Sequence, residues 1–211
     1  MLVTRLAAYC AAASILAGCA IGRDIVDVKT PEAANPAMGK IVRIESVVDK
    51  RTFEVAPPSA DIPSLDPDAD TSDAAKARAI GRKRGGFGKA FGDVVLPEGK
   101  TVSGLVEGAV SSAFQESGYK VVRKGDPEYA AATPVNAKVT EFWAWFAPGF
   151  WSVTTNHKAQ VEVSGGPLAA PETVKTRVSE SHQVVTLDDW REIVEKGLSA
   201  ITEQTKKILK R

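Results

Sequence analysis

Residues 135–163 read VNAKVTEFWAWFAPGFWSVTTNHKAQVEV, and this stretch decides the fold because it holds two runs of alternating side chains. A period of two is typical of β-strands. Pro148-Gly149 separates the two runs, and a short turn of this kind is typical of an antiparallel hairpin. We therefore predict strands over 135–146 and 151–163 with a turn between them.

Three other segments have the strand pattern, at residues 40–49, 119–123 and 172–186, and two segments have the helix pattern. The first helix carries an apolar stripe over 102–114 and should end at Gly118. The second should begin at Thr186 or Asp188 and continue to the cationic C-terminus. This order predicts an α+β fold, in which an antiparallel β-sheet of about five strands carries two amphipathic helices packed on one face.

The composition excludes several classes of function. The length of 211 residues suits one domain, and 27 Lys and Arg against 26 Asp and Glu give a net charge of +1. Proteins that bind nucleic acids need an excess of cations to neutralise phosphates, so we expect no nucleic-acid partner. Both cysteines, Cys10 and Cys19, lie near the N-terminus, which leaves no thiol elsewhere for catalysis, a disulfide or a metal.

The N-terminus has the parts of a secretory signal: a cation at Arg5, an apolar run over 6–16 and small residues after it. The run is shorter than the ~20 apolar residues of a membrane-spanning helix. Residues 16–19 (LAGC) resemble the lipobox of bacterial lipoproteins. The resemblance implies that residues 1–18 are a signal peptide and that Cys19 becomes an N-terminus carrying palmitate-like acyl chains, which anchor the protein in a membrane. The alternative is an ordinary signal peptide with a chance cysteine.

The same resemblance implies a location and a domain plan. Lipoproteins of this class with Asp directly after the cysteine stay in the inner membrane, whereas this chain has Ala20, so we expect the periplasmic face of the outer membrane. Residues 19–39 mix Pro, Ala, Asn and Gly without a period, which predicts a lipidated N-terminus and a flexible tether. Residues 40–211 then form a single α+β domain with a long Pro- and Gly-rich insertion at 53–99.

Aromatic residues gather around the turn at 148–149. Alternate residues of a strand face opposite sides of the sheet, so one core cannot bury all of them. We therefore predict a surface that binds an envelope protein or lipid headgroups, since aromatic side chains favour both. The predicted residues are Trp143, Trp145, Phe146, Phe150 and Trp151. The alternative is that the insertion at 53–99 covers one face and the helices cover the other.

A basic, glycine-rich segment lies inside the insertion, at residues 81–92 (GRKRGGFGKAFG). Its cations Arg82, Arg84 and Lys89 are candidates for binding an anion such as a lipid phosphate or an acidic protein. The segment is not a P-loop, because the residue after Gly88-Lys89 is Ala90 instead of Ser or Thr. The alternative is a solvated loop without a ligand.

His157 and His182 are the two histidines. If Val163 lies opposite Val174 in a hairpin, His157 lies opposite Glu180 and Thr155 lies opposite His182. A histidine beside a carboxylate can act in acid–base catalysis, but a polar cross-strand pair is the simpler interpretation. Asp49 and Arg51 are predicted to form an ion pair at the end of a strand. We predict no catalytic residue, no metal and no cofactor.

The lipobox, a strand ending in VVDKR (47–51) and a helix ending in ESGY (116–119) give the chain a resemblance to the YajG-like family of periplasmic lipoproteins. The resemblance implies a small α+β lipoprotein without catalytic residues. The predicted function is therefore non-catalytic binding or scaffolding in assembly of the cell envelope. Two alternatives stay open: an auxiliary lipoprotein of lipid or lipopolysaccharide transport, and a lipoprotein associated with flagellar biosynthesis.

Overall fold

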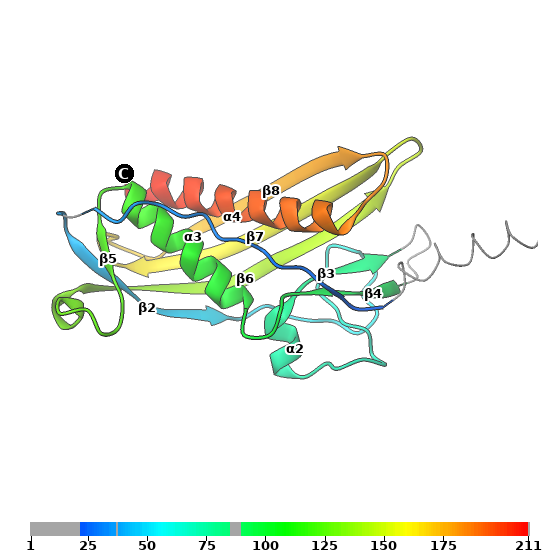
Figure 1. Ribbon diagram of the computed structural model, residues 1–211, viewed down its shortest axis with the longest axis horizontal. Helices are drawn as coiled ribbons and strands as arrows, with labels where there is room; N and C mark the ends of the chain where they lie inside the picture. The colour runs from blue at the N-terminus through cyan, green and yellow to red at the C-terminus, as the bar shows by residue number, and fades with distance from the viewer. Residues whose placement is uncertain (1–21, 37, 85–89, 211) are drawn as a thin grey trace, which may run out of the picture.

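The computed structural model describes residues 22–36, 38–84 and 90–210, which form one sheet with helices against it (Figure 1). The elements in chain order are β1 (Asp24–Ile25), β2 (Ile41–Asp49), α2 (Asp73–Arg78), β3 (Ala79–Arg84), β4 (Ala90–Val95), α3 (Val102–Glu116), β5 (Lys120–Val122), a 3₁₀ turn (Tyr129–Ala131), β6 (Thr133–Pro148), β7 (Val153–Gly165), β8 (Glu172–His182) and α4 (Leu187–Leu209).

The long strand β6 organises the sheet. It pairs antiparallel with β7 along its whole length, and β7 pairs antiparallel with β8. The other edge of β6 is shared, because β2 pairs parallel with its first half and β3 pairs parallel with it at Gly81 and Ala144. Beyond these, β5 lies beside β2, β4 lies beside β3, and β1 lies beside β4.

The α+β class is confirmed, but the prediction of about five antiparallel strands is wrong. The described residues form a mixed sheet of eight strands. The pairs β1–β4, β2–β5, β2–β6 and β3–β6 are all parallel. Alternation in the sequence shows which side chains share a face and leaves the direction of the neighbouring strand open. Parallel neighbours need a long crossover, and the chain between β2 and β6, which contains α3, supplies one.

The two long helices lie on one face of the sheet, as predicted (Figure 1). Thr101 caps α3 by accepting a hydrogen bond from the backbone N–H of Gly104 at 3.1 Å. The helix ends at Glu116, and Gly118 follows the C-cap residue Ser117 with a φ of +87°, a conformation that glycine adopts without strain. Thr186 caps α4 through a reciprocal capping box with Asp189. Both predicted helix boundaries are therefore confirmed.

The core lies between this helical layer and the sheet. Buried apolar residues of α3, such as Val106 and Phe114, and of α4, such as Leu198 and Ile201, pack with the inward residues of β6 and β7. Each such side chain contributes about 1.5–3 kcal/mol when it leaves water. The helices therefore hold one face of the hairpin that decides the fold.

The N-terminal segment 22–36 packs on the domain, which corrects the prediction of a flexible tether over 19–39. Val26 and Val28 are buried in the main core, 4% and 1% exposed. Asn35 completes the edge of β5, because its amide donates to the carbonyl of Val121 at 2.8 Å and accepts from the N–H of the same residue at 2.9 Å. Val26 and Val28 alternate with charged residues, which is a short strand-like pattern. The prediction of a tether rested on the composition of the whole segment and did not take this pattern into account. Cys19 lies outside the described residues.

The segment 53–99 also differs from the predicted irregular insertion. It contributes α2, β3 and β4, and the two strands belong to the same sheet as the rest of the domain. Its first part folds over the face of β6 that the helices leave uncovered: Leu65 and Ala75 pack with Trp143 and Trp145 in a second, smaller core. The prolines and aspartates of this segment conceal two strands of six residues each.

Candidate functional site

Trp143 and Trp145, predicted to bind a partner, are buried at 0% and 6% exposure. The indole N–H of Trp143 donates to the carbonyl of Ala60 at 3.2 Å, and the ring of Phe53 meets that of Trp143 edge-on at 5.9 Å. The 53–99 segment therefore covers this face, as the alternative interpretation expected. The prediction that these two tryptophans form a partner-binding surface is corrected.

Phe146 points to the other face, where it is half-buried and its ring lies 5.9 Å from that of Trp190 on α4. Only Phe150 and Trp151 among the five predicted aromatics are open to solvent, 89% and 86% exposed. They occupy the β6–β7 turn, and their rings meet edge-on at 4.8 Å. The aromatic candidate site is thus reduced to this turn.

Arg82 and Arg84 are buried, although the sequence predicts cations that face an anion. Arg82 donates to the carbonyl of Leu65 at 2.7 Å and lies 3.6 Å from Asp93. Arg84 donates to the carbonyl of Pro57 at 3.0 Å and to the hydroxyl of Ser64 at 2.7 Å. The two guanidinium groups therefore hold the loop at 57–66 against β3, which corrects the prediction of a solvent-facing anion site. Lys89 lies outside the described residues.

Arg82 also affects the ionisation of Arg84. Burial, together with the positive charge of Arg82, lowers the pKa of Arg84 below its usual value. The alternation of Arg82 and Arg84 along β3 places both on the face that the loop covers, while Lys83 faces the other way and pairs with Asp24 at 2.7 Å. The position of these cations is a consequence of the strand that the sequence did not reveal.

A hydroxyl, an imidazole and a carboxylate meet at the start of α4. The Oγ1 atom of Thr155 lies 3.0 Å from Nε2 of His182, and Nδ1 of His182 lies 3.0 Å from Asp189. This order is the one found in nucleophile–His–carboxylate triads. Thr155 is, however, only 1% exposed, so a substrate does not reach its hydroxyl in this conformation.

Thr155 and His182 are in contact, but the register of β7 and β8 that brings them together is not the predicted one. Val163 pairs with Glu172, so His157 lies opposite Val178, Thr155 lies opposite Glu180, and His182 lies opposite Val153. The prediction is wrong by two residues, because β8 begins at Glu172 and pairs that residue, instead of Val174, with Val163. Burial opposes ionisation of Asp189, but hydrogen bonds from Thr186 and the charge of His182 outweigh it and lower the pKa of this carboxyl.

His157 is fully buried, and neither ring nitrogen has a hydrogen-bond partner within the part of the chain that the structure describes. Its ring meets that of Phe142 edge-on at 4.5 Å. Burial, aided by the charge of Arg51, lowers the pKa of His157 from 6.5 to about 3. The imidazole is therefore neutral at physiological pH, and the predicted pairing with Glu180 is wrong.

The predicted ion pair of Asp49 and Arg51 is confirmed, with an Nη2–Oδ2 distance of 2.7 Å. Arg51 also donates to the carbonyls of Ala79 (2.7 Å), Phe142 (3.1 Å) and Lys76 (2.8 Å). The guanidinium thus joins the end of β2 to the C-terminus of α2 and to β6. These contacts indicate that Arg51 has a structural role.

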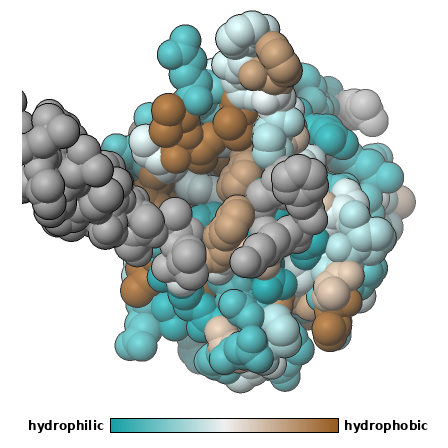
Figure 2. All heavy atoms as spheres, turned by 90° about the vertical axis from the view of Figure 1, so that its right-hand side faces the viewer, coloured by the Kyte–Doolittle hydropathy of each residue, from teal (hydrophilic) through white to brown (hydrophobic). Residues whose placement is uncertain are grey.

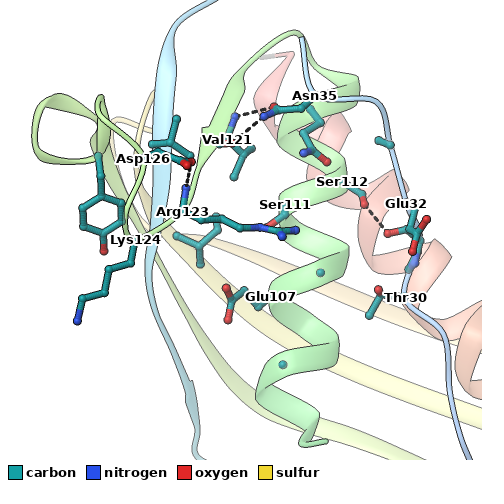
Figure 3. Close-up of a pocket in the computed structure, with 18 residues that line it drawn as sticks. Thr30, Glu32, Asn35, Glu107, Ser111, Ser112, Val121, Arg123, Lys124 and Asp126 are labelled. Carbon is teal, nitrogen blue, oxygen red and sulfur yellow. Dashed lines mark hydrogen bonds between the residues drawn. The ribbon is translucent and has the colours of Figure 1, made fainter. Parts of the chain in front are cut away.

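An open groove of about 1000 Å³ lies between the N-terminal segment, α3 and the connection after β5 (Figure 3). Gly108 permits the close packing of the segment on α3, because a Cβ at this position would lie 2.7 Å from the side chain of Thr30. The polar residues of the lining are Thr30, Glu32, Asn35, Glu107, Ser111, Ser112, Gln115, Arg123, Lys124 and Asp126.

The groove carries charges of both signs at short range. The side chain of Arg123 extends across it toward Ser111, and Glu107 projects from α3 into the same space (Figure 3). Such a lining suits the mixed charges and amides of a polypeptide better than an acyl chain. The sequence pattern did not indicate this groove, because one of its walls, residues 28–36, has the composition of a tether.

Metal-binding clusters and membrane-spanning helices are both absent from the described residues. No group of three or more His, Cys, Asp or Glu side chains in that part of the chain is arranged to hold a metal ion. None of the helices formed by those residues has both the length and the apolar character needed to cross a membrane.

Comparison with known proteins leaves the family of this chain open. No protein-family model matches the sequence, and no curated protein matches it. Among solved structures, the chain is similar to the crystal structure of an uncharacterized protein, with 7% sequence identity and a TM-score of 0.46, over 90% of this chain and 98% of the other.

Proposed function

We propose that this protein is a lipoprotein, anchored through acyl chains on Cys19 in the periplasmic leaflet of the outer membrane, that binds an envelope protein without catalysing a reaction. The lipobox-like residues 16–19 support the anchor. The groove beside α3 supports the binding role, and it is the observation that carries the proposal, because it is open, largely polar and lined from three separate segments.

The chemistry of the groove favours a polypeptide as its occupant. Glu107 and Arg123 offer a carboxylate and a guanidinium in the same open groove of about 1000 Å³. The edge of β5 lies at the same place, where Asn35 already binds the backbone of Val121 through two hydrogen bonds, as a neighbouring strand would. A partner segment would add to these polar contacts.

The buried polar groups support a non-catalytic role. Thr155 is enclosed, His157 is enclosed and neutral, and the carboxylate of Asp189 already takes part in the cap of α4. Each of these groups has a structural task or is shielded from solvent. A catalytic site instead needs titratable groups that converge on an accessible pocket.

Site-specific cross-linking tests the binding role. Ser111→Cys places a thiol in the groove for a photoreactive maleimide, whereas Ser199→Cys places one on the exposed side of α4 as a control. We expect Ser111→Cys to yield a discrete adduct with an envelope protein that mass spectrometry identifies. Arg123→Glu should abolish this adduct, and Lys175→Glu on the exposed face of β8 should not.

The results that contradict the proposal are clear. Equal adducts from both cysteine variants, or no adduct from either, would remove the groove as a protein-binding site. Phospholipid or lipopolysaccharide extracted from the detergent-free protein would instead favour the lipid-transport alternative.

A further inference from the structure

Several strands of the sheet begin or end at the same end of the molecule. β3 and β6 run parallel and pair at Gly81 and Ala144, and both strands end a few residues further on, at Arg84 and Pro148. β8 ends opposite Val153, the first residue of β7. The β6–β7 turn, the end of β3, the start of β4 and the β8–α4 connection therefore share one end of the molecule, on the right in Figure 1.

The described chain begins at this same end. The backbone N–H of Gly22 donates to the carbonyl of Phe91, near the start of β4, at 2.7 Å. The fit is tight, since a Cβ on Gly92 would lie 1.7 Å from the carbonyl oxygen of Gly22. From Gly22 onward the segment is packed on the domain, so residues after Gly22 add no length to the link between Cys19 and the domain.

The distance to the acylated cysteine is correspondingly short. Gly22 lies three residue steps after Cys19, and an extended chain spans at most ~3.3–3.6 Å per residue. A lipid-bearing Cys19 thus holds this end of the domain within roughly 10 Å of the headgroups, about the diameter of one helix. A second protein domain does not fit into that space.

The surface at this end has the composition of a membrane contact. Phe150 and Trp151 project from the β6–β7 turn, whereas Val184 on the β8–α4 connection and Leu187 at the start of α4 are 73% and 49% exposed. Figure 2 faces this end and shows hydrophobic surface in its upper part, bordered by hydrophilic side chains. Tryptophan and other aromatic residues favour the level of the lipid headgroups, where one part of the ring is apolar and its edge is wet.

Two carboxylates near this end, Asp24 and Asp188, are each paired with a cation. Asp24 pairs with Lys83 at 2.7 Å, and Asp188 pairs with Arg191 at 3.0 Å. Ion pairing reduces the repulsion that a free carboxylate would meet from anionic headgroups.

We propose that this end of the domain rests on the lipid bilayer that holds the acyl chains, with Phe150 and Trp151 inserted among the headgroups of the periplasmic leaflet. The inference rests on the proposed acylation of Cys19, which brings the surface to the membrane. The acyl chains supply the affinity, and the aromatic turn fixes the orientation of the domain. In this orientation the groove beside α3 stays accessible from the periplasm.

Tryptophan fluorescence tests the inference, because three of the four tryptophans, Trp143, Trp145 and Trp190, are buried and Trp151 is exposed. The full-length protein is purified from bacterial membranes, its acylation is verified by intact mass, and it is reconstituted into vesicles of phosphatidylethanolamine and phosphatidylglycerol. Brominated lipids quench tryptophan on contact, and iodide quenches tryptophan exposed to water. The matched control is Trp151→Phe, which keeps an aromatic ring in an exposed turn and removes the reporter.

We expect brominated lipid to quench the acylated protein, more strongly with bromine high on the acyl chain than near its end, and iodide not to reach Trp151. Trp151→Phe should lose the lipid-dependent part of the quenching. Acylated protein whose Trp151 remains open to iodide and insensitive to brominated lipid overturns the inference, and so does protection by a protein partner that appears only in native envelopes. Absence of acylation would instead refute the proposed anchor.

Discussion

The buried imidazole of His157 should make the protein less stable in mild acid. In the folded protein its pKa is about 3, whereas in the unfolded chain it returns to the ordinary value near 6.5. Between these two values the unfolded state binds a proton that the folded state excludes. Stability therefore falls as the pH falls from 6.5 toward 3, which is the sign that linkage requires when unfolding takes up protons.

The size of the effect follows from the same two pKa values. Each pH unit inside this window lowers the free energy of unfolding by about 1.4 kcal/mol, so the contribution of His157 between pH 7 and pH 5 is about 2 kcal/mol. Replacing the imidazole by an apolar side chain of similar size, as in His157→Leu, removes this contribution. The substitution also removes two buried nitrogens that lack hydrogen-bond partners among the described residues.

Urea denaturation followed by circular dichroism at pH 7 and pH 5 measures the effect. Changes in packing cancel, because each protein is compared with itself at the two pH values. We expect the wild type to lose about 2 kcal/mol more than His157→Leu over this interval. The control is His182→Gln, which changes the other histidine and leaves His157 in place. This variant should still show the contribution of His157 to the loss of free energy of unfolding between pH 7 and pH 5, about 2 kcal/mol. Equal losses in wild type and His157→Leu would refute the reasoning.

Three further substitutions test contacts that hold the fold. Arg51→Met should lower the free energy of unfolding by about 3–5 kcal/mol in chemical denaturation, because it removes the buried guanidinium that pairs with Asp49 and donates to three carbonyls. A loss below about 1 kcal/mol would contradict the structural role. Gly197→Ala should destabilise the protein by about 1–3 kcal/mol, because its Cβ would lie 2.2 Å from the ring of His157. The same change in a His157→Ala background should not destabilise the protein, and equal losses of stability in both backgrounds would exclude the clash. Thr186→Ala should lower the thermal midpoint through a loss of about 1 kcal/mol at the cap of α4, and an unchanged midpoint would show that the cap does not contribute.

The sequence predicts the two long helices and the central hairpin because their patterns are long and local. Thr186 caps the second helix as predicted, and Gly118 lies just past the end of the first. The strand runs around Pro148-Gly149 are correct because a period of two sustained over a dozen residues matches the pleat of a strand and does not match the turn of a helix. These elements depend on side chains a few residues apart.

The errors concern contacts between distant segments. Arg82 and Arg84 look solvated in the sequence, because glycines and other cations surround them, but they lie on a strand under the loop at 57–66. Val26 and Val28 look like part of a linker, but they enter the core beside β4 and α3. Neither the parallel pairing of β2 with β6 nor the groove between 28–36 and α3 has a local signature.

Intact-mass analysis of the protein isolated from its own membranes tests the central claim most directly. The account predicts a chain that begins at Cys19 and carries the mass of its acyl groups. Loss of those groups in Cys19→Ala, together with release of the protein into the soluble fraction, would complete the result. A chain that begins elsewhere, or a Cys19 terminus free of acyl chains, would contradict both the anchor and the orientation derived from it.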